Sequence, residues 1–155
     1  MLTLFVSMMT IGAPAFASEP GYNIIAEQGH AQSLQVEMKV IHATTQHKNV
    51  DPKVQSLLKY FDDYKYTGYK LLDNQSRKFF DMKGETFYLP SDIKVDIKIL
   101  SHNDKNAKVS IKIINSKTDH KYISSIMTVP RNGNFMVAGP KYDNGILILP
   151  LSIKY

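Results

Sequence analysis

The stretch IKVDIKILSHNDKNAKVSIKI (Ile93–Ile113) decides the fold class. Apolar residues alternate with polar ones over Ile93–Ile99 and again over Val109–Ile113. A period of two is typical of a strand with one buried face. Asn103–Asn106 between the two segments has the composition of a turn. The stretch therefore predicts an antiparallel β-hairpin.

Shorter patterns of the same kind predict strands on both sides of this hairpin. They cover Leu34–Val40, Tyr69–Leu72, Lys78–Met82, Thr86–Leu89, Tyr122–Val129, Phe135–Ala138 and Ile146–Ile153. Pro150 places the last strand at an edge or a bulge. The turns carry glycines for which we expect positive φ angles: Gly133, Gly139 and Gly145.

One segment reads as a helix, over about residues 52–64. Asp51 is a suitable N-cap and Pro52 suits the first helical position. Val54, Leu57, Leu58 and Phe61 then form a single apolar stripe at helical spacing. The fold class is therefore α+β and mainly β: an antiparallel β-sandwich or open barrel with one packed α-helix, as a single domain over 34–155.

The composition excludes several classes of function. The 155 residues contain no Cys, so disulfides, thiol catalysis and Cys-based metal sites are excluded. The formal net charge is +5. Such a charge favours anionic partners, and it also suits ordinary solubility.

The N-terminus reads as a secretory signal peptide. An apolar block at residues 2–11 precedes Ala15 and Ala17, which are spaced as an A-x-A cleavage signal. We expect cleavage after Ala17, so that 1–17 is removed and 18–33 is a lead-in segment. The protein is then periplasmic or secreted, with no transmembrane span after signal cleavage. The alternative is an uncleaved anchor, for which the block is short.

No catalytic or metal-binding pattern stands out. His30, His42, His47, His102 and His120 are scattered, and the sequence contains no HExxH, GxSxG or phosphate-loop motif. Asp62 and Asp63 are adjacent and would point about 100° apart on a helix. We therefore expect no catalytic residue, no metal and no cofactor. Solvated loop positions are the simplest interpretation of all these side chains.

Two groups of residues are candidates for binding. The first is aromatic: Tyr60, Tyr64, Tyr66 and Tyr69, with lysines nearby. Such rings stack on sugars or on protein surfaces, or they cover the edge of a core. The second is basic: Lys94, Lys98, Lys108 and Lys112 lie on the polar faces of the predicted hairpin and should share one solvent face, interrupted by Asp96. This face would attract an anionic polymer or an acidic protein, or protect a sheet edge.

The run Ile146–Leu149 is apolar without alternation. A strand that is buried on both faces has this pattern, and so does a strand that joins the sheet of a partner.

The order of several blocks resembles a group of small exported proteins of deltaproteobacteria. The blocks are VDPKVQSLLKYF (Val50–Phe61), YKLL (Tyr69–Leu72), GETFYLP (Gly84–Pro90) and PRNGNFMVAGPKYDNGILILPL (Pro130–Leu151). The resemblance covers about residues 34–155 and implies export. Its motifs are structural, and it implies no site residue.

These observations favour an exported, non-catalytic binding or assembly module of the bacterial envelope. It would bind an envelope protein or an anionic polymer through an aromatic or basic face, with the tyrosines as first candidates and the hairpin lysines as second, and no nucleic acid is expected. One alternative is an accessory protein that pairs its last strand with a secretion or pilus component. The other is a small hydrolase that acts on an envelope polymer.

Overall fold

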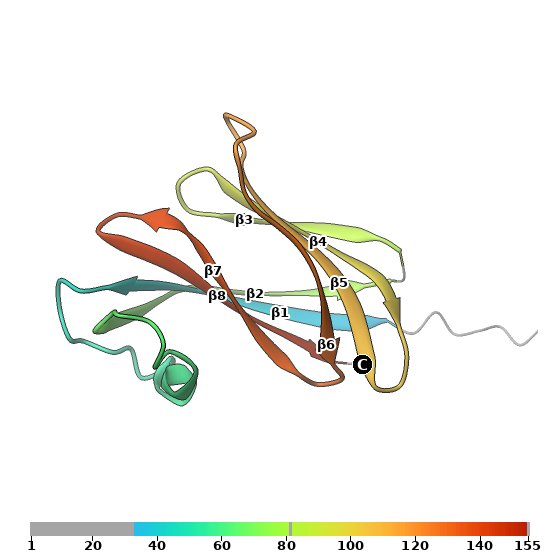
Figure 1. The fold of residues 1–155 in the computed structure, drawn as a ribbon, viewed down its shortest axis with the longest axis horizontal. Coiled ribbons are helices and arrows are strands. Elements are labelled where there is room, and N and C mark those ends of the chain that lie inside the picture. The colour runs from blue at the N-terminus through green and yellow to red at the C-terminus, as the bar shows by residue number, and fades with distance from the viewer. Residues whose placement is uncertain (1–32, 81, 155) are drawn as a thin grey trace, which may run out of the picture.

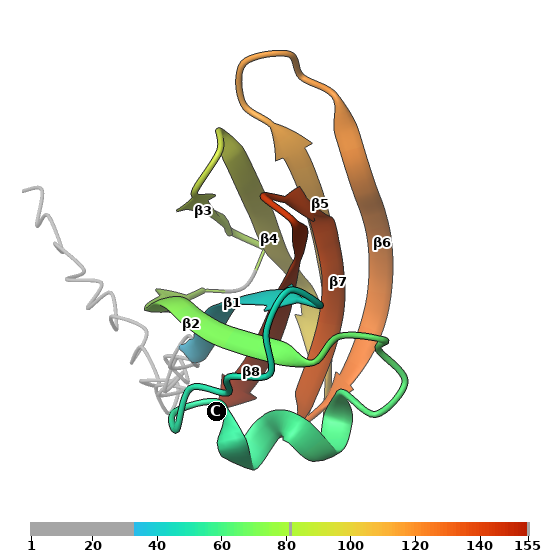
Figure 2. The same cartoon turned by 90° about the vertical axis from the view of Figure 1, so that its left-hand side faces the viewer.

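The computed structural model describes residues 33–80 and 82–154, which form two antiparallel four-stranded sheets. Sheet A has the order β2–β1–β8–β7 and sheet B the order β3–β4–β5–β6 (Figures 1 and 2). The strands are β1 (Leu34–Thr44), β2 (Gly68–Phe79), β3 (Gly84–Leu89), β4 (Ile93–His102), β5 (Asn106–Asn115), β6 (Lys121–Pro130), β7 (Asn134–Tyr142) and β8 (Gly145–Lys154). The prediction of a mainly β antiparallel sandwich is confirmed.

The signal peptide predicted at 1–17, residues 18–32 of the lead-in segment and His30 lie outside the described residues. In the part of the chain that is described, no helix is long and apolar enough to cross a membrane.

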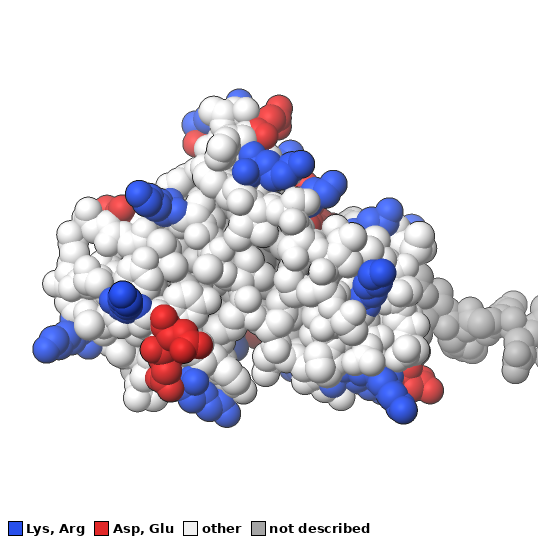
Figure 3. All heavy atoms as spheres, in the orientation of Figure 1, with Lys and Arg blue, Asp and Glu red and all other residues white. Residues whose placement is uncertain are grey.

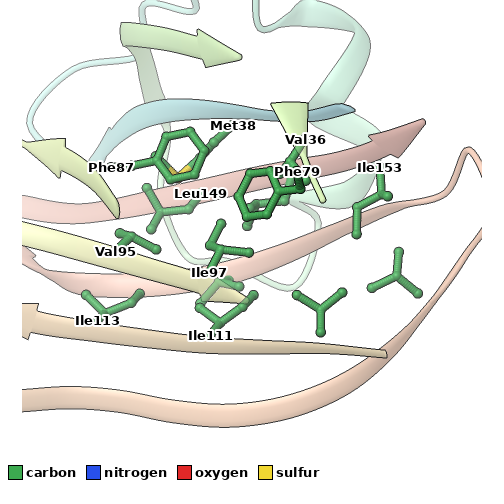
Figure 4. Close-up of a cluster of buried hydrophobic side chains, with 14 of the residues drawn as sticks. Val36, Met38, Phe79, Phe87, Val95, Ile97, Ile111, Ile113, Leu149 and Ile153 are labelled. Carbon is green, nitrogen blue, oxygen red and sulfur yellow. The ribbon is translucent and has the colours of Figure 1, made fainter. Parts of the chain in front are cut away.

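The main core lies between the inner faces of the two sheets (Figure 4). Ile97 on β4 and Ile111 on β5 are fully buried, which confirms the alternation predicted for the hairpin. Opposite them, β1 and β8 contribute Met38 and Leu149. These apolar faces stabilise the sandwich because their burial removes apolar surface from water.

A second, smaller core lies on the outer face of sheet A. Ile41 on β1 and Ile148 on β8 point outward and contact a cluster that includes Val54 and Phe61. The register between β1 and β2 shifts at Val40/Ile41. Both residues at this irregularity are fully buried, in different cores. Sheet A is therefore covered on both faces over part of its length.

The segment that covers sheet A differs from the predicted α-helix. It contains a 3-10 helix, η1 (Gln55–Tyr60), with turns before and after it (Figure 2). Its backbone bonds span three residues, as in Val54 N–H to Asp51 O at 2.8 Å. The apolar stripe is nevertheless used, since Val54 and Phe61 are buried. The prediction of an α-helix over 52–64 was wrong in helix type and in length.

Two further expectations about the strands are corrected. The two short strands expected over 69–72 and 78–82 are one strand, β2. The last strand, β8, is not at an edge, because it lies between β1 and β7. The β1–β8 ladder has a gap opposite Lys39 and Val40, which is where Pro150 and Leu149 lie. The missing N–H of Pro150 is tolerated at this interruption.

No glycine of the described residues has a positive φ, contrary to the expectation for the turns. Asn132 and Asp143, each within a turn, adopt that conformation instead, with φ of 53° and 47°. Gly145 allows β8 to approach the backbone of β1 closely. A Cβ at this position would overlap the carbonyl oxygen of Ala43 on β1.

Candidate functional site

The outer face of sheet B carries a hollow of about 510 Å³ that is lined by three of the four predicted lysines, Lys94, Lys98 and Lys112. The first two lie on β4 and the third on β5. All three alternate with buried neighbours such as Ile97 and Ile111, so the strand period fixes their direction toward solvent.

The hollow exists because the strand register brings short side chains together between the lysines. Gly84 on β3 pairs with Lys98, and Lys98 pairs with Ser110 on β5. Gly84 has no side chain and Ser110 has a small one. The resulting floor is low and offers a hydroxyl group.

Asp96 lies at the centre of this face and interrupts the basic surface, as the sequence predicted. Its Oδ1 accepts a hydrogen bond from the hydroxyl of Thr86 on β3 at 2.6 Å. On the other side it pairs with Lys112 in the ladder. The carboxylate is therefore held by Thr86 and is only partly exposed.

The charge of the lining is modestly positive. The lining residues include three lysines, Asp96 and Glu85, which gives a formal net charge of +1 (3 − 2). Glu85 lies 3.9 Å from Arg77 on β2 in an ion pair. Lys108 is exposed on the same face of β5 and lies outside the hollow. Figure 3 shows that basic side chains are also spread over other parts of the surface.

The tyrosines lie on the opposite side of the sandwich, at the outer face of sheet A. Tyr69 is buried, and its ring stacks on Phe61 with centroids 4.9 Å apart. Its hydroxyl donates to the carbonyl of Tyr66 at 3.1 Å. Tyr64 meets the edge of Phe61 at 6.3 Å. These three tyrosines pack against the second core.

Tyr60 is the most exposed of the four tyrosines, at 46%, with Lys59 over its ring at 4.9 Å. The aromatic and the basic candidates therefore do not share one face. The structure separates the two groups onto the outer faces of different sheets. The alternative interpretation, in which the rings cover the edge of a core, describes Tyr64, Tyr66 and Tyr69.

Burial raises the pKa of the Tyr69 hydroxyl above its ordinary value. The negative charge of Asp62 raises this pKa further, and Tyr64 and Tyr66 add to the effect. Tyr69 is thus held in its neutral form, as suits a buried packing residue.

The histidines do not converge on one site. Within residues 33–80 and 82–154, no three His, Asp or Glu side chains gather as metal ligands. His42 packs edge-on against Tyr142 at 5.2 Å, and His120 packs against Tyr122 at 5.0 Å. His102 is half-buried at the end of β4.

His47 and Asp51 line one shallow hollow, the sort of pairing that a hydrolase would need. Both side chains are occupied in local turns. His47 Nδ1 accepts the N–H of Asn49 at 3.2 Å, and Asp51 Oδ1 accepts the N–H of Lys53 at 2.9 Å. The nearby hydroxyl of Tyr69 donates to a backbone carbonyl. This arrangement stabilises the loop and presents no activated nucleophile.

The sequence missed Gly84, Thr86 and Ser110, the residues that shape the hollow. The alternation in β5 places Ser110 between Lys108 and Lys112, so this residue was open to prediction. The other two lie on β3, and their position depends on the register between β3 and β4. No local pattern in the sequence specifies that register.

Comparison with family models, with curated proteins and with solved structures finds no match. The candidate site is therefore defined by the geometry of this chain.

Proposed function

We propose that this protein is an exported, non-catalytic binding module of the bacterial envelope that holds an anionic polymer against the outer face of sheet B. The observation that carries the proposal is the hollow lined by Lys94, Lys98 and Lys112. The export part rests on the signal-like N-terminus, with its apolar block and its A-x-A spacing.

A polymer suits this site better than a small ligand. The lysines come from two neighbouring strands around an open surface, and each ammonium group is a mobile point charge. Such charges gain little from a single exposed anion. A chain with regularly spaced phosphate or carboxylate groups would meet several lysines at once, and each contact would release counterions. The hydroxyl of Ser110 supplies a donor to the same oxygens.

The alternative in which the last strand pairs with a partner loses its structural basis. β8 is hydrogen-bonded to β1 on one side and to β7 on the other. A partner strand would have to displace one of them, and with it part of the main core. The hydrolase alternative is not favoured, since the hollow on sheet B contains no histidine and the side chains of His47 and Asp51 are held in local turns.

The proposal is tested with two matched triple variants. K94Q/K98Q/K112Q removes three charges from the hollow, and K48Q/K53Q/K65Q removes three exposed charges on the side of sheet A. Both lower the formal net charge from +5 to +2 (5 − 3). Dissociation constants for long-chain polyphosphate and for polygalacturonate would be measured at several salt concentrations, which separates phosphate from carboxylate as the preferred group.

We expect the native chain to bind one of the two polymers, with an affinity that falls as salt rises. The first triple variant should bind about tenfold or more weakly, because several contacts are lost together. The second should change affinity by about twofold or less, because its charges lie on the other side of the sandwich and are screened by salt. Equal losses in the two variants would mean that only net charge matters, and the assigned site would then be wrong.

A further inference from the structure

β6 is an edge strand of unusual composition. Its only ladder partner among the described residues is β5. Between Lys121 and Arg131 it contains no charged residue. Its Ile126 is 59% exposed on the outer face. Ser125 pairs with buried Ile111 and so faces inward, yet it is exposed, which shows that sheet A does not cover β6 at this residue.

The other three edges carry features that block strand addition. β3 is only six residues long. β2 carries charged side chains along its length, including Lys70, Asp73 and Arg77. β7 contains Pro140 and an irregular register between Ala138 and Lys141. Short strands, charges, prolines and bulges are the usual protections of a sheet edge. β6 lacks them over Ser124–Thr128.

The backbone direction of β6 shows which groups are free. The N–H of Arg131 donates to the carbonyl of Lys105, on the side of β5. Backbone groups alternate along an antiparallel strand, so those of Ser124, Ile126 and Thr128 point away from β5. Pro130 fits this alternation, because its missing N–H also falls on the outer side.

We propose that β6 pairs antiparallel with β6 of a second copy of this chain, about a two-fold axis at Ser125. A second copy of the chain presents the same unprotected edge, its own β6. Pairing the two β6 strands about a two-fold axis satisfies the free backbone groups of both edges and gives a closed dimer. In this register Ile123 faces the partner's Met127, and Ser124 faces the partner's Ile126. A shift of the axis to Ile126 would bring Lys121, at one end of β6, near the partner's Arg131, and the repulsion between like charges disfavours that shift.

The pairing has a consequence for the proposed polymer site, although it does not depend on that site. It joins two copies of sheet B into one eight-stranded sheet with both outer faces on the same side. The two β5 strands would be three strand spacings apart, about 14 Å. The lysines of both hollows would then lie along one continuous surface, which would raise the avidity for a long polyanion.

The test uses two single variants that place a lysine on the same outer face. I126K adds a charge to the β6 edge, and Y88K adds one to β3, where Tyr88 is 68% exposed. Sedimentation equilibrium of the purified protein should show a monomer–dimer equilibrium for the native chain. We expect I126K to weaken dimerisation by about tenfold or more, and Y88K to leave it unchanged.

A second measurement fixes the register. The chain contains no Cys, so S125C introduces a single thiol. At the proposed axis the two Cα atoms would be about 4.5 Å apart, within reach of a disulfide. Mild oxidation should give a disulfide-linked dimer with S125C and not with S116C, at an exposed position in the β5–β6 turn.

Three results would overturn the proposal. They are a native chain that stays monomeric at every soluble concentration, an I126K variant that dimerises as the native chain does, and a native dimer in which S125C fails to cross-link. The first would leave the edge for an extended peptide of another protein. Loss of dimerisation with polyanion binding intact would separate this proposal from the polymer site.

Discussion

Tyr69 links the loop before β2 to the second core, and its environment makes stability depend on pH. The native state holds the Tyr69 proton more tightly than the unfolded chain does, because burial and Asp62 raise its pKa. This contribution to the free energy of unfolding is complete below about pH 10. It is lost as the pH rises through the raised native pKa. We expect stability to fall on the alkaline side.

The control is Tyr69→Phe, measured by urea unfolding between about pH 8 and pH 11. The variant loses the hydrogen bond to the Tyr66 carbonyl, so it should be less stable at pH 8 by about 1 kcal/mol. Its stability should also fall less steeply above pH 10. The remaining tyrosines titrate in both proteins, so an unchanged slope would show that Tyr69 ionises as easily in the native state as in the unfolded one.

Single residues also show where the sequence misleads. The glycines in turns suggested positive φ angles, yet Asn132 and Asp143 adopt them. Asn and Asp tolerate this conformation, so the turn was recognisable while the residue responsible was not. Gly145 is required by its distance from Ala43 across the β1–β8 ladder. A requirement of that kind depends on a neighbour about 100 residues away and leaves no local signal.

The segment that contains η1 is the element that closes the second core. Phe61 is 2% exposed and stacks on Tyr69, whereas its neighbour Tyr60 is 46% exposed. We expect Phe61→Ala to lower the free energy of unfolding by about 3 kcal/mol, through lost burial and the cavity that remains. Tyr60→Ala, the matched control, should change it by about 0.5 kcal/mol or less.

Chemical denaturation of the two variants provides the measurement. Similar losses for Phe61→Ala and Tyr60→Ala would mean that the segment packs loosely on sheet A. The tyrosines would then again be candidate contact residues, because a loosely packed segment could turn its rings toward a ligand.

At the level of elements, periodicity predicted the strands with one clear buried face and failed elsewhere. The β4–β5 hairpin was predicted because both alternations and the turn agree. The prediction divided β2 into two strands because Asp73–Lys78 is polar throughout, which is allowed in an edge strand. The stripe of Val54 and Phe61 identified a packed segment, but a stripe does not distinguish an α-helix from 3-10 turns. The type of helix that forms depends on how the two ends of the segment are anchored, for example by the hydrogen bond from Tyr69 N–H to Asn49 O.

At the level of the molecule, the candidate site depends on which face each element covers. The sequence placed four lysines on one face of a hairpin, and three of them line the hollow. It could not separate this face from the tyrosines, because no local pattern shows which sheet the segment with η1 packs on. Pairing between β1 and β8 determines that the segment packs on sheet A, since Ile41 and Ile148 together form the surface that the segment covers.

The same topology predicts the order of folding. Sheet B consists of consecutive strands, and its β4–β5 pairs join residues as close as His102 and Ala107, 5 apart (107 − 102). Sheet A closes only when β1 meets β8, where Gln35 pairs with Lys154, 119 residues away (154 − 35). Loop closure makes the distant contact slow to form. Sheet B should therefore be the more structured part of the transition state.

The matched variants are Ile111→Val on β5 and Ile153→Val on β8, both at fully buried positions of the main core. Each should lower the free energy of unfolding by about 1 kcal/mol. Chevron measurements should show that Ile111→Val mainly slows folding, whereas Ile153→Val mainly speeds unfolding. The reverse partition would mean that pairing of the two chain ends comes first, and that sheet B folds onto a preformed sheet A.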